Sequence, residues 1–155
     1  MRQRGFSLIE LVVAIAIISI LLSMATMSFN YYNRKSRIED QIKSVYSDIV
    51  KHRTEAMFKR TAESIKYTTT TFAFYSSSVV TVQPVYQRIL KYPMNSSGSG
   101  QIDFDERGLS TPGSNASICV SASNEAAYDS IVVGTVRTQM GKSNGTCTDA
   151  NIQPK

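Results

Sequence analysis

A single carboxylate, that of Glu10, interrupts the apolar run that extends from Phe6 to Phe29. An ionised side chain in a hydrocarbon environment is costly, and it usually has a charged partner or a functional role. The run contains no other charged residue, so Glu10 finds no partner within it. Glu10 is therefore the first candidate functional residue of the chain.

The chain contains two cysteines, Cys119 and Cys147, both late in the sequence. In an exported domain, a disulfide between them would stabilise the fold by roughly 3 to 4 kcal/mol on the chain-entropy model. In a cytosolic protein the same pair would remain as free thiols, because that compartment is reducing. The compartment of the domain therefore decides between these two states.

The remaining reactive side chains form no recognisable catalytic or metal-binding pattern. The only histidine, His52, lies among charged residues, and one histidine with two scattered cysteines is too few for a zinc site. No nucleophile elbow is present either. Asp103, Asp105 and Glu106 could hold calcium, but the segment lacks the further oxygen ligands of an EF-hand, which favours a solvated turn. We expect no enzymatic activity, no cofactor and no metal site.

The N-terminal residues have the composition of a membrane anchor. Residues 1–5 contain two arginines and no acid, which places this end in the cytoplasm by the positive-inside rule. The apolar run of residues 6–29 would measure about 36 Å as a helix, enough to cross a bilayer core of about 30 Å. The run is longer than the core of an ordinary secretory signal, and no A-x-A-like cleavage pattern follows it. The alternative is an uncleaved anchor or an unusual signal peptide.

The helical pattern continues through residues 30–64 and becomes amphipathic. The apolar residues that recur at spacings of three, four or seven are Ile38, Ile42, Val45, Ile49 and Ala56. No glycine or proline occurs between Phe6 and Ser64, so we predict one helix of more than fifty residues. Its basic residues after position 33 could bind nucleic acid or lipid headgroups. We favour a solvated helix face with pairs such as Glu39 and Lys43.

Residues 65–155 are predicted to form a β-rich head. Threonine, valine and aromatic residues recur there with the period of a strand, between clusters of turn residues. The expected strands are residues 65–75, 79–82, 85–92, 101–104, 116–121 and 130–136. Residues 95–100 are expected to be a loop, and residues 139–155 a polar tail that only Cys147 ties down. The predicted class is α+β, with the long helix packed on one small antiparallel sheet.

The formal net charge of +5 is unevenly distributed. Residues 34–66 hold nine basic and five acidic residues, whereas residues 67–155 hold six of each. The basic excess therefore lies at the N-terminus and on the helix. A strongly basic, nucleic-acid-binding head is not expected from this distribution.

The N-terminal sequence resembles the prepilin signature of type IV pilins and type II secretion pseudopilins. The resemblance lies in a short basic leader that ends at Gly5, followed by Phe6-Ser-Leu-Ile-Glu10 and the apolar run. Weaker similarity to H-type pseudopilins and FimT-like minor pilins lies in Asp103-Phe-Asp-Glu-Arg-Gly108 and Ile131-Val-Val-Gly-Thr-Val-Arg137. Ser19 and Met27 stand where major pilins often carry helix breakers, which favours a minor component.

This resemblance implies a filament subunit that is anchored in the bacterial inner membrane with its head outside the cytoplasm. A membrane prepilin peptidase would remove residues 1–5 by cutting between Gly5 and Phe6, and would methylate the new amine of Phe6. Glu10 would pair with the Phe6 amine of a neighbouring subunit during assembly. The alternative implied function is a DNA-binding minor pilin of an uptake pilus. Its candidate DNA contacts are Arg137, Lys142 and Lys155.

Overall fold

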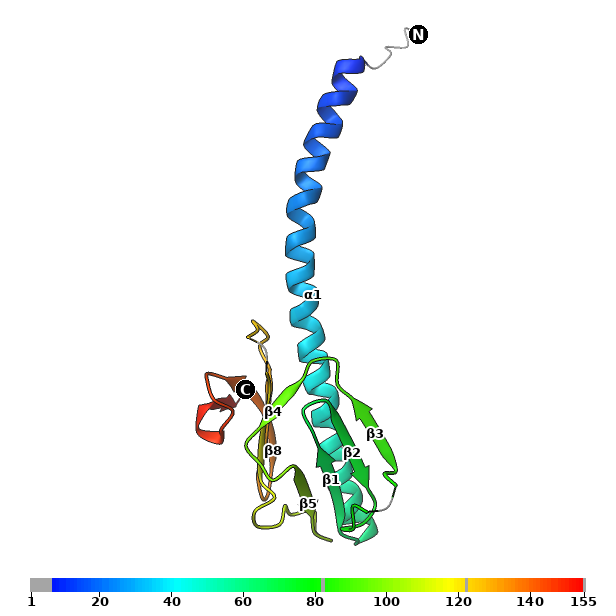
Figure 1. Ribbon diagram of the computed structural model, residues 1–155, viewed down its shortest axis with the longest axis vertical. Helices are drawn as coiled ribbons and strands as arrows, with labels where there is room; N and C mark the ends of the chain where they lie inside the picture. Colours follow the sequence, from blue (N-terminus) through cyan, green and yellow to red (C-terminus); the bar gives the residue numbers. More distant parts are fainter. Residues whose placement is uncertain (1–6, 82, 122, 155) are drawn as a thin grey trace. The chain divides into compact units, whose positions relative to one another are not determined.

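A computed structural model describes residues 7–81, 83–121 and 123–154 of the chain (Figure 1). Among them is one α-helix, α1 (Leu8–Lys59), which has 52 residues. The chain divides into two compact units, Met1–Arg34 and Lys35–Lys155, and α1 contributes residues to both. The predicted long N-terminal helix is confirmed.

The helix ends at Lys59 and not at Ser64 as predicted. Arg60 follows it with a backbone φ of 51°, in the left-handed region, and the amide of Thr61 donates to the carbonyl of Ala56 at 3.2 Å. This is the bonding pattern of a Schellman motif, in which glycine usually takes the left-handed position. Because arginine occupies that position here, the sequence carried no glycine to mark the helix end.

The predicted apolar stripe of α1 lies in the core of the second unit. Its members are fully buried: Ile38, Ile42, Val45, Ile49 and Ala56. They belong to one cluster with buried strand residues that include Ile65, Phe72, Ile102, Phe104, Ile118 and Ile131. The charged residues predicted as a pair find other partners, since Glu39 accepts a hydrogen bond from the Ala127 amide and Lys43 lies over the Tyr128 ring.

The strands form two antiparallel sheets, not the single sheet that was predicted. The first sheet has the order β3-β2-β1-β5 and consists of β1 (Glu63–Tyr67), β2 (Thr71–Tyr75), β3 (Tyr86–Ile89) and β5 (Gln101–Phe104). The second has the order β4-β6-β7-β8-β9 and consists of β4 (Met94–Ser96), β6 (Ala116–Val120), β7 (Ser130–Val133), β8 (Thr138–Ser143) and β9 (Ile152–Pro154). A short 3-10 helix, η1 (Asp149–Asn151), precedes β9. The α+β class is confirmed.

The predicted strand at residues 79–82 is wrong for the part that the structure describes, because residues 79–81 are not in a strand and residues 80–81 form a turn. The Ser77 hydroxyl accepts from the Val79 amide at 3.2 Å and donates to the Val79 carbonyl at 3.2 Å. Local side-chain hydrogen bonds of this kind compete with strand pairing. They override the β propensity of the valines.

The C-terminal tail is also different from the prediction, because residues 138–143 and 152–154 are strands. β8 pairs with β7 through the register Ile131 to Met140, and β9 pairs with β8 through Lys142 to Gln153. β4 likewise occupies part of the expected loop at 95–100. Ladder hydrogen bonds join backbone groups, so a polar strand can pair without a hydrophobic pattern.

Gly108 allows the loop after β5 to approach α1, and its replacement by alanine is expected to destabilise the protein. Its φ is +72°, and an added Cβ would lie 2.9 Å from the Arg53 carbonyl oxygen and 2.5 Å from Met57 Cγ. Left-handed backbone strain and overpacking together should lower the free energy of unfolding of Gly108→Ala by about 2 to 4 kcal/mol, as measured by denaturant unfolding.

Gly113→Ala is the matched control, because Gly113 has a φ of +85° but nothing within 4 Å of an added Cβ. Its free energy of unfolding should fall only by the cost of the left-handed backbone conformation, about 1 to 2 kcal/mol. Equal losses in the two variants would show that the contact with α1 contributes nothing.

Candidate functional site

The first part of α1 exposes a continuous apolar surface, here called the apolar helix surface and defined as residues 8–22. Large apolar side chains along it are at least half exposed, from Val13 at 50% to Leu8 at 80%. The most apolar 18-residue window of α1 has a mean hydropathy of 2.7 and none of it is buried. Length and composition alone would allow α1 to cross a membrane. Exposed apolar surface of this extent marks contact with another protein or a membrane.

Glu10 lies in the first turn of α1, on this surface, and is exposed. A carboxylate in the first turn of a helix interacts favourably with the helix dipole. No basic side chain within residues 7–81, 83–121 and 123–154 forms an ion pair with it. The hydroxyl of Ser19 donates instead to the Ile15 carbonyl of its own helix at 2.8 Å, so it needs no external partner. Among the residues that the structure describes, Glu10 therefore has no ion-pair partner. The predicted cleavage residues Gly5 and Phe6 lie outside them.

Cys119 and Cys147 form a disulfide, which is the state that the sequence predicted for this pair in an exported domain. Cys119 lies on β6, and Cys147 lies in the segment between β8 and η1, 28 residues later. Their Cα atoms are 5.7 Å apart. The bond therefore joins β6, an inner strand of the second sheet, to the C-terminal segment.

The predicted DNA contacts differ in their surroundings. Arg137 is exposed just before β8. Lys142 is engaged in the fold, because its ammonium donates to Asp129 Oδ2 at 2.7 Å and to the Asn124 carbonyl at 2.8 Å. Lys155 lies outside the described residues. DNA binding stays a prediction, and Lys142 would have to break its ion pair to contact a phosphate.

The acidic group at residues 103–106 closes a loop after β5. Asp105 Oδ1 accepts hydrogen bonds from the Arg107 amide at 2.9 Å and the Leu109 amide at 2.8 Å. Asp103 Oδ2 accepts from the Ser114 hydroxyl at 3.2 Å. These bonds hold a turn, the arrangement that the sequence favoured over a calcium loop.

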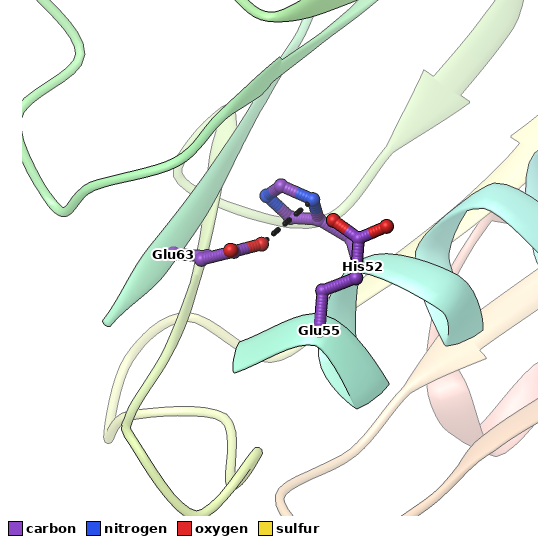
Figure 2. A group of neighbouring side chains, drawn as sticks. All are labelled: His52, Glu55 and Glu63. Atoms are coloured by element: carbon purple, nitrogen blue, oxygen red, sulfur yellow. Dashed lines mark ion pairs between the residues drawn. The ribbon is translucent and has the colours of Figure 1, made fainter. Parts of the chain in front are cut away.

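Three ionisable side chains that are separated in the sequence meet near the C-terminal end of α1 (Figure 2). We call His52, Glu55 and Glu63 the His52 cluster; each offers a ligand atom, and these atoms all lie within 4.8 Å of one another. His52 Nδ1 lies 3.0 Å from Glu63 Oε2. His52 and Glu55 are three residues apart on α1, and this spacing puts them on one face of the helix. Glu63 joins them only through the fold.

Lys59 completes this group of charges. Its ammonium lies 3.0 Å from Glu55 Oε2 and 3.0 Å from Glu63 Oε1. The hydrogen bond from Lys59 lowers the pKa of Glu55, and the hydrogen bonds to Glu55 and Glu63 raise the pKa of Lys59. His52, Glu55 and Lys59 border a groove of about 360 Å³ whose apolar side is formed by Phe74, Val85 and Tyr86.

Known proteins are similar to this chain in its N-terminal sequence and in its fold. Residues 1–26 match the family model of the prokaryotic N-terminal methylation motif. The fold is similar to that of the type IV minor pilin FimU of Pseudomonas aeruginosa (strain PAO1) in its P21 crystal form. That match has a TM-score of 0.56 and 12% identity, and covers 72% of this chain and 92% of the FimU chain. The P65 form gives a TM-score of 0.53 and 14% identity, with coverage of 67% and 92%. No curated protein matches the sequence significantly. The chain thus carries a prepilin motif and has the type IV pilin fold.

Proposed function

We propose that a chain with this motif and this fold is a filament subunit, a minor pilin or minor pseudopilin, that assembles through α1. The observation that carries the proposal is that the methylation motif covers residues 1–26, and the helix within it exposes its apolar side chains. A helix of this kind needs a hydrophobic environment, which a membrane supplies before assembly and neighbouring helices supply in a filament. The filament is a type IV pilus or a type II secretion pseudopilus.

The proposed location before assembly is the bacterial inner membrane, with one span and the head outside the cytoplasm. The basic residues Arg2 and Arg4 precede the apolar run, as expected for a cytoplasmic N-terminus. The Cys119–Cys147 disulfide supports a head in an oxidising compartment, since such bonds are rare in the cytosol.

The proposed maturation step is cleavage by a prepilin peptidase between Gly5 and Phe6, followed by methylation of the Phe6 amine. Gly5 has no side chain that would obstruct a protease. The new cationic amine would lie about one helical turn from Glu10 of its own chain, so the two charges are correctly spaced to pair between neighbouring subunits. We propose other pilin or pseudopilin subunits as the partners, and a structural and not an enzymatic role for the head.

Mass spectrometry of the protein from its native membrane tests the maturation step. The expected intact mass corresponds to a chain that begins at Phe6 and carries one methyl group, with the Cys119–Cys147 bond oxidised. A Gly5→Val variant should retain Met1, because its branched side chain obstructs the cleavage site. A wild-type chain that keeps residues 1–5, or starts at another residue, would contradict the proposal.

A further inference from the structure

We propose that His52, Glu55 and Glu63 form a binding site for a zinc-like divalent cation, and that the Lys59 ammonium occupies the site when the metal is absent. The proposal concerns the head of the subunit and does not depend on how the N-terminal helix assembles. It rests on the hydrogen bonding of His52, on the burial of Glu63 and on the chemistry of the three ligands (Figure 2).

His52 presents an electron pair to the cluster. Its Nε2 lies 3.0 Å from the Tyr75 carbonyl oxygen. A carbonyl can only accept, so Nε2 carries the proton and, in the neutral ring, Nδ1 carries the lone pair. A metal-binding histidine commonly has its other nitrogen held in this way by a carbonyl. His52 is therefore oriented as a metal ligand through Nδ1.

Glu63 supplies a buried oxygen that lacks a hydrogen-bond donor. Its side chain is 0% exposed, and Oε1 accepts from Lys59 at 3.0 Å. Oε2 lies 3.0 Å from His52 Nδ1, but within the described part of the chain no donor forms an aligned hydrogen bond to it. A buried carboxylate oxygen that faces a nitrogen lone pair is repelled by it, and a metal ion bound to both atoms would remove that repulsion.

The ligand set and its spacing suit zinc. In tetrahedral coordination with bonds of about 2.0 to 2.2 Å, ligand atoms lie about 3.3 to 3.6 Å apart. The Nδ1–Oε2 distance of 3.0 Å is close to this spacing, and the partly exposed Glu55 side chain can rotate to bring in its oxygen. One nitrogen and two carboxylates favour Zn²⁺ over Ca²⁺ and Mg²⁺, which prefer oxygen ligands alone. A fourth position would face the groove and take water.

Lys59 is placed to exchange with the metal. Its ammonium bonds both Glu55 and Glu63, which are the two anionic ligands of the proposed site. The side chain of Lys59 is 51% exposed, so it can move into solvent without breaking the core. Lys51, 3.8 Å from Glu55 Oε1, is a second cation near the cluster and is more exposed than Lys59. Removing the Lys59 charge should therefore strengthen metal binding.

Calorimetric titration of the full chain in detergent micelles, stripped of metal with EDTA, tests the site with Zn²⁺ alone. We expect one Zn²⁺ per chain and an increase in the thermal midpoint with zinc concentration. His52→Gln and Glu55→Gln should each lose about tenfold or more in affinity. Glu106→Gln, which removes an exposed carboxylate outside the cluster, should bind as the wild type does.

Lys59→Met separates a metal site from a purely structural ion-pair network. If Lys59 competes with the metal, this variant binds Zn²⁺ more tightly than the wild type, and zinc raises its thermal midpoint by a larger increment. Since Lys59 and Glu55 are partly exposed, their variants keep the test decisive if His52→Gln does not fold. The proposal is overturned if about 100 µM Zn²⁺ does not bind, if Glu55→Gln binds it equally well, or if Lys59→Met binds it no more tightly.

Discussion

Replacing Glu10 with alanine is expected to give a chain that is still processed and inserted into the membrane but no longer enters filaments. The apolar helix surface is retained in the variant, so anchoring should not change. A charge-assisted hydrogen bond such as the proposed pair with the Phe6 amine contributes about 1.5 to 3 kcal/mol. Its loss predicts an incorporation about tenfold to a hundredfold lower. The measurement is the amount of subunit in sheared filaments relative to the membrane fraction, by immunoblotting.

Ser19→Ala is the matched control for this experiment, because it removes a polar group from the same apolar surface. Its hydroxyl bonds the Ile15 carbonyl within the helix, so its loss should leave incorporation at the wild-type level. Glu10→Lys should incorporate no better than Glu10→Ala, since a lysine would repel the neighbouring amine. Wild-type incorporation of Glu10→Ala would show that Glu10 does not set the register of assembly.

Removing the disulfide with Cys119→Ser and Cys147→Ser together is expected to destabilise the head by about 3 to 4 kcal/mol. The bond closes a loop across 28 residues, and without it the C-terminal segment is held to the second sheet mainly by the β8–β9 ladder. For a folded unit of this size, the loss corresponds to a fall of roughly 10 °C or more in the thermal midpoint. Differential scanning calorimetry of the oxidised protein and the double variant measures it.

Reduction supplies an internal control for the disulfide. A thiol reductant should lower the midpoint of the wild type toward that of the double variant, and should leave the variant itself unchanged. If the double variant unfolded at the wild-type temperature, the bond would be dispensable and the antiparallel pairing of β7, β8 and β9 would be sufficient to order the tail.

The two largest expected effects fall in different units of the chain. Glu10 lies in Met1–Arg34 and acts on contacts with other subunits, whereas the disulfide lies in Lys35–Lys155 and acts on the stability of the head. Variants at the two sites should therefore be additive in stability measurements, because sites in separate compact units without shared contacts rarely couple. The experiment on Glu10 measures only the incorporation of the subunit into filaments.

Periodic patterns in the sequence were sufficient to predict the long helix and its buried face. The stripe from Ile38 to Ala56 repeats at helical spacing over several turns, and every one of its members is in the core. The apolar run and the position of Glu10 within it were equally predictable, because length, hydropathy and a single charged residue are local properties of the sequence. The alternation of Phe72 and Phe74 predicted a strand for the same reason. The strand predicted over residues 65–75 is, however, two paired strands, β1 and β2, separated by residues 68–70.

Features that depend on distant backbone pairing could not be predicted in this way. The polar strands β8 and β9 form through ladder hydrogen bonds, and β4 pairs with β6 while β5 pairs with β1. The division into two sheets therefore depends on which strands pair with each other, and residue types alone do not encode that pairing. Lys142 likewise looked free in the sequence but pairs with Asp129 across the β7–β8 hairpin.

The His52 cluster shows most clearly the difference between what the sequence predicts and what tertiary structure brings together. On the predicted helix to Ser64, Glu63 would lie about 16 Å along the axis from His52. The left-handed turn at Arg60 ends the helix and sends the chain back as β1, which brings Glu63 within 3.0 Å of His52. The sequence by itself therefore determined the helix, its apolar surface and the Glu10 charge. Tertiary structure decided where the helix stops and which charges meet beyond it, because a single backbone reversal depends on packing and not on periodicity.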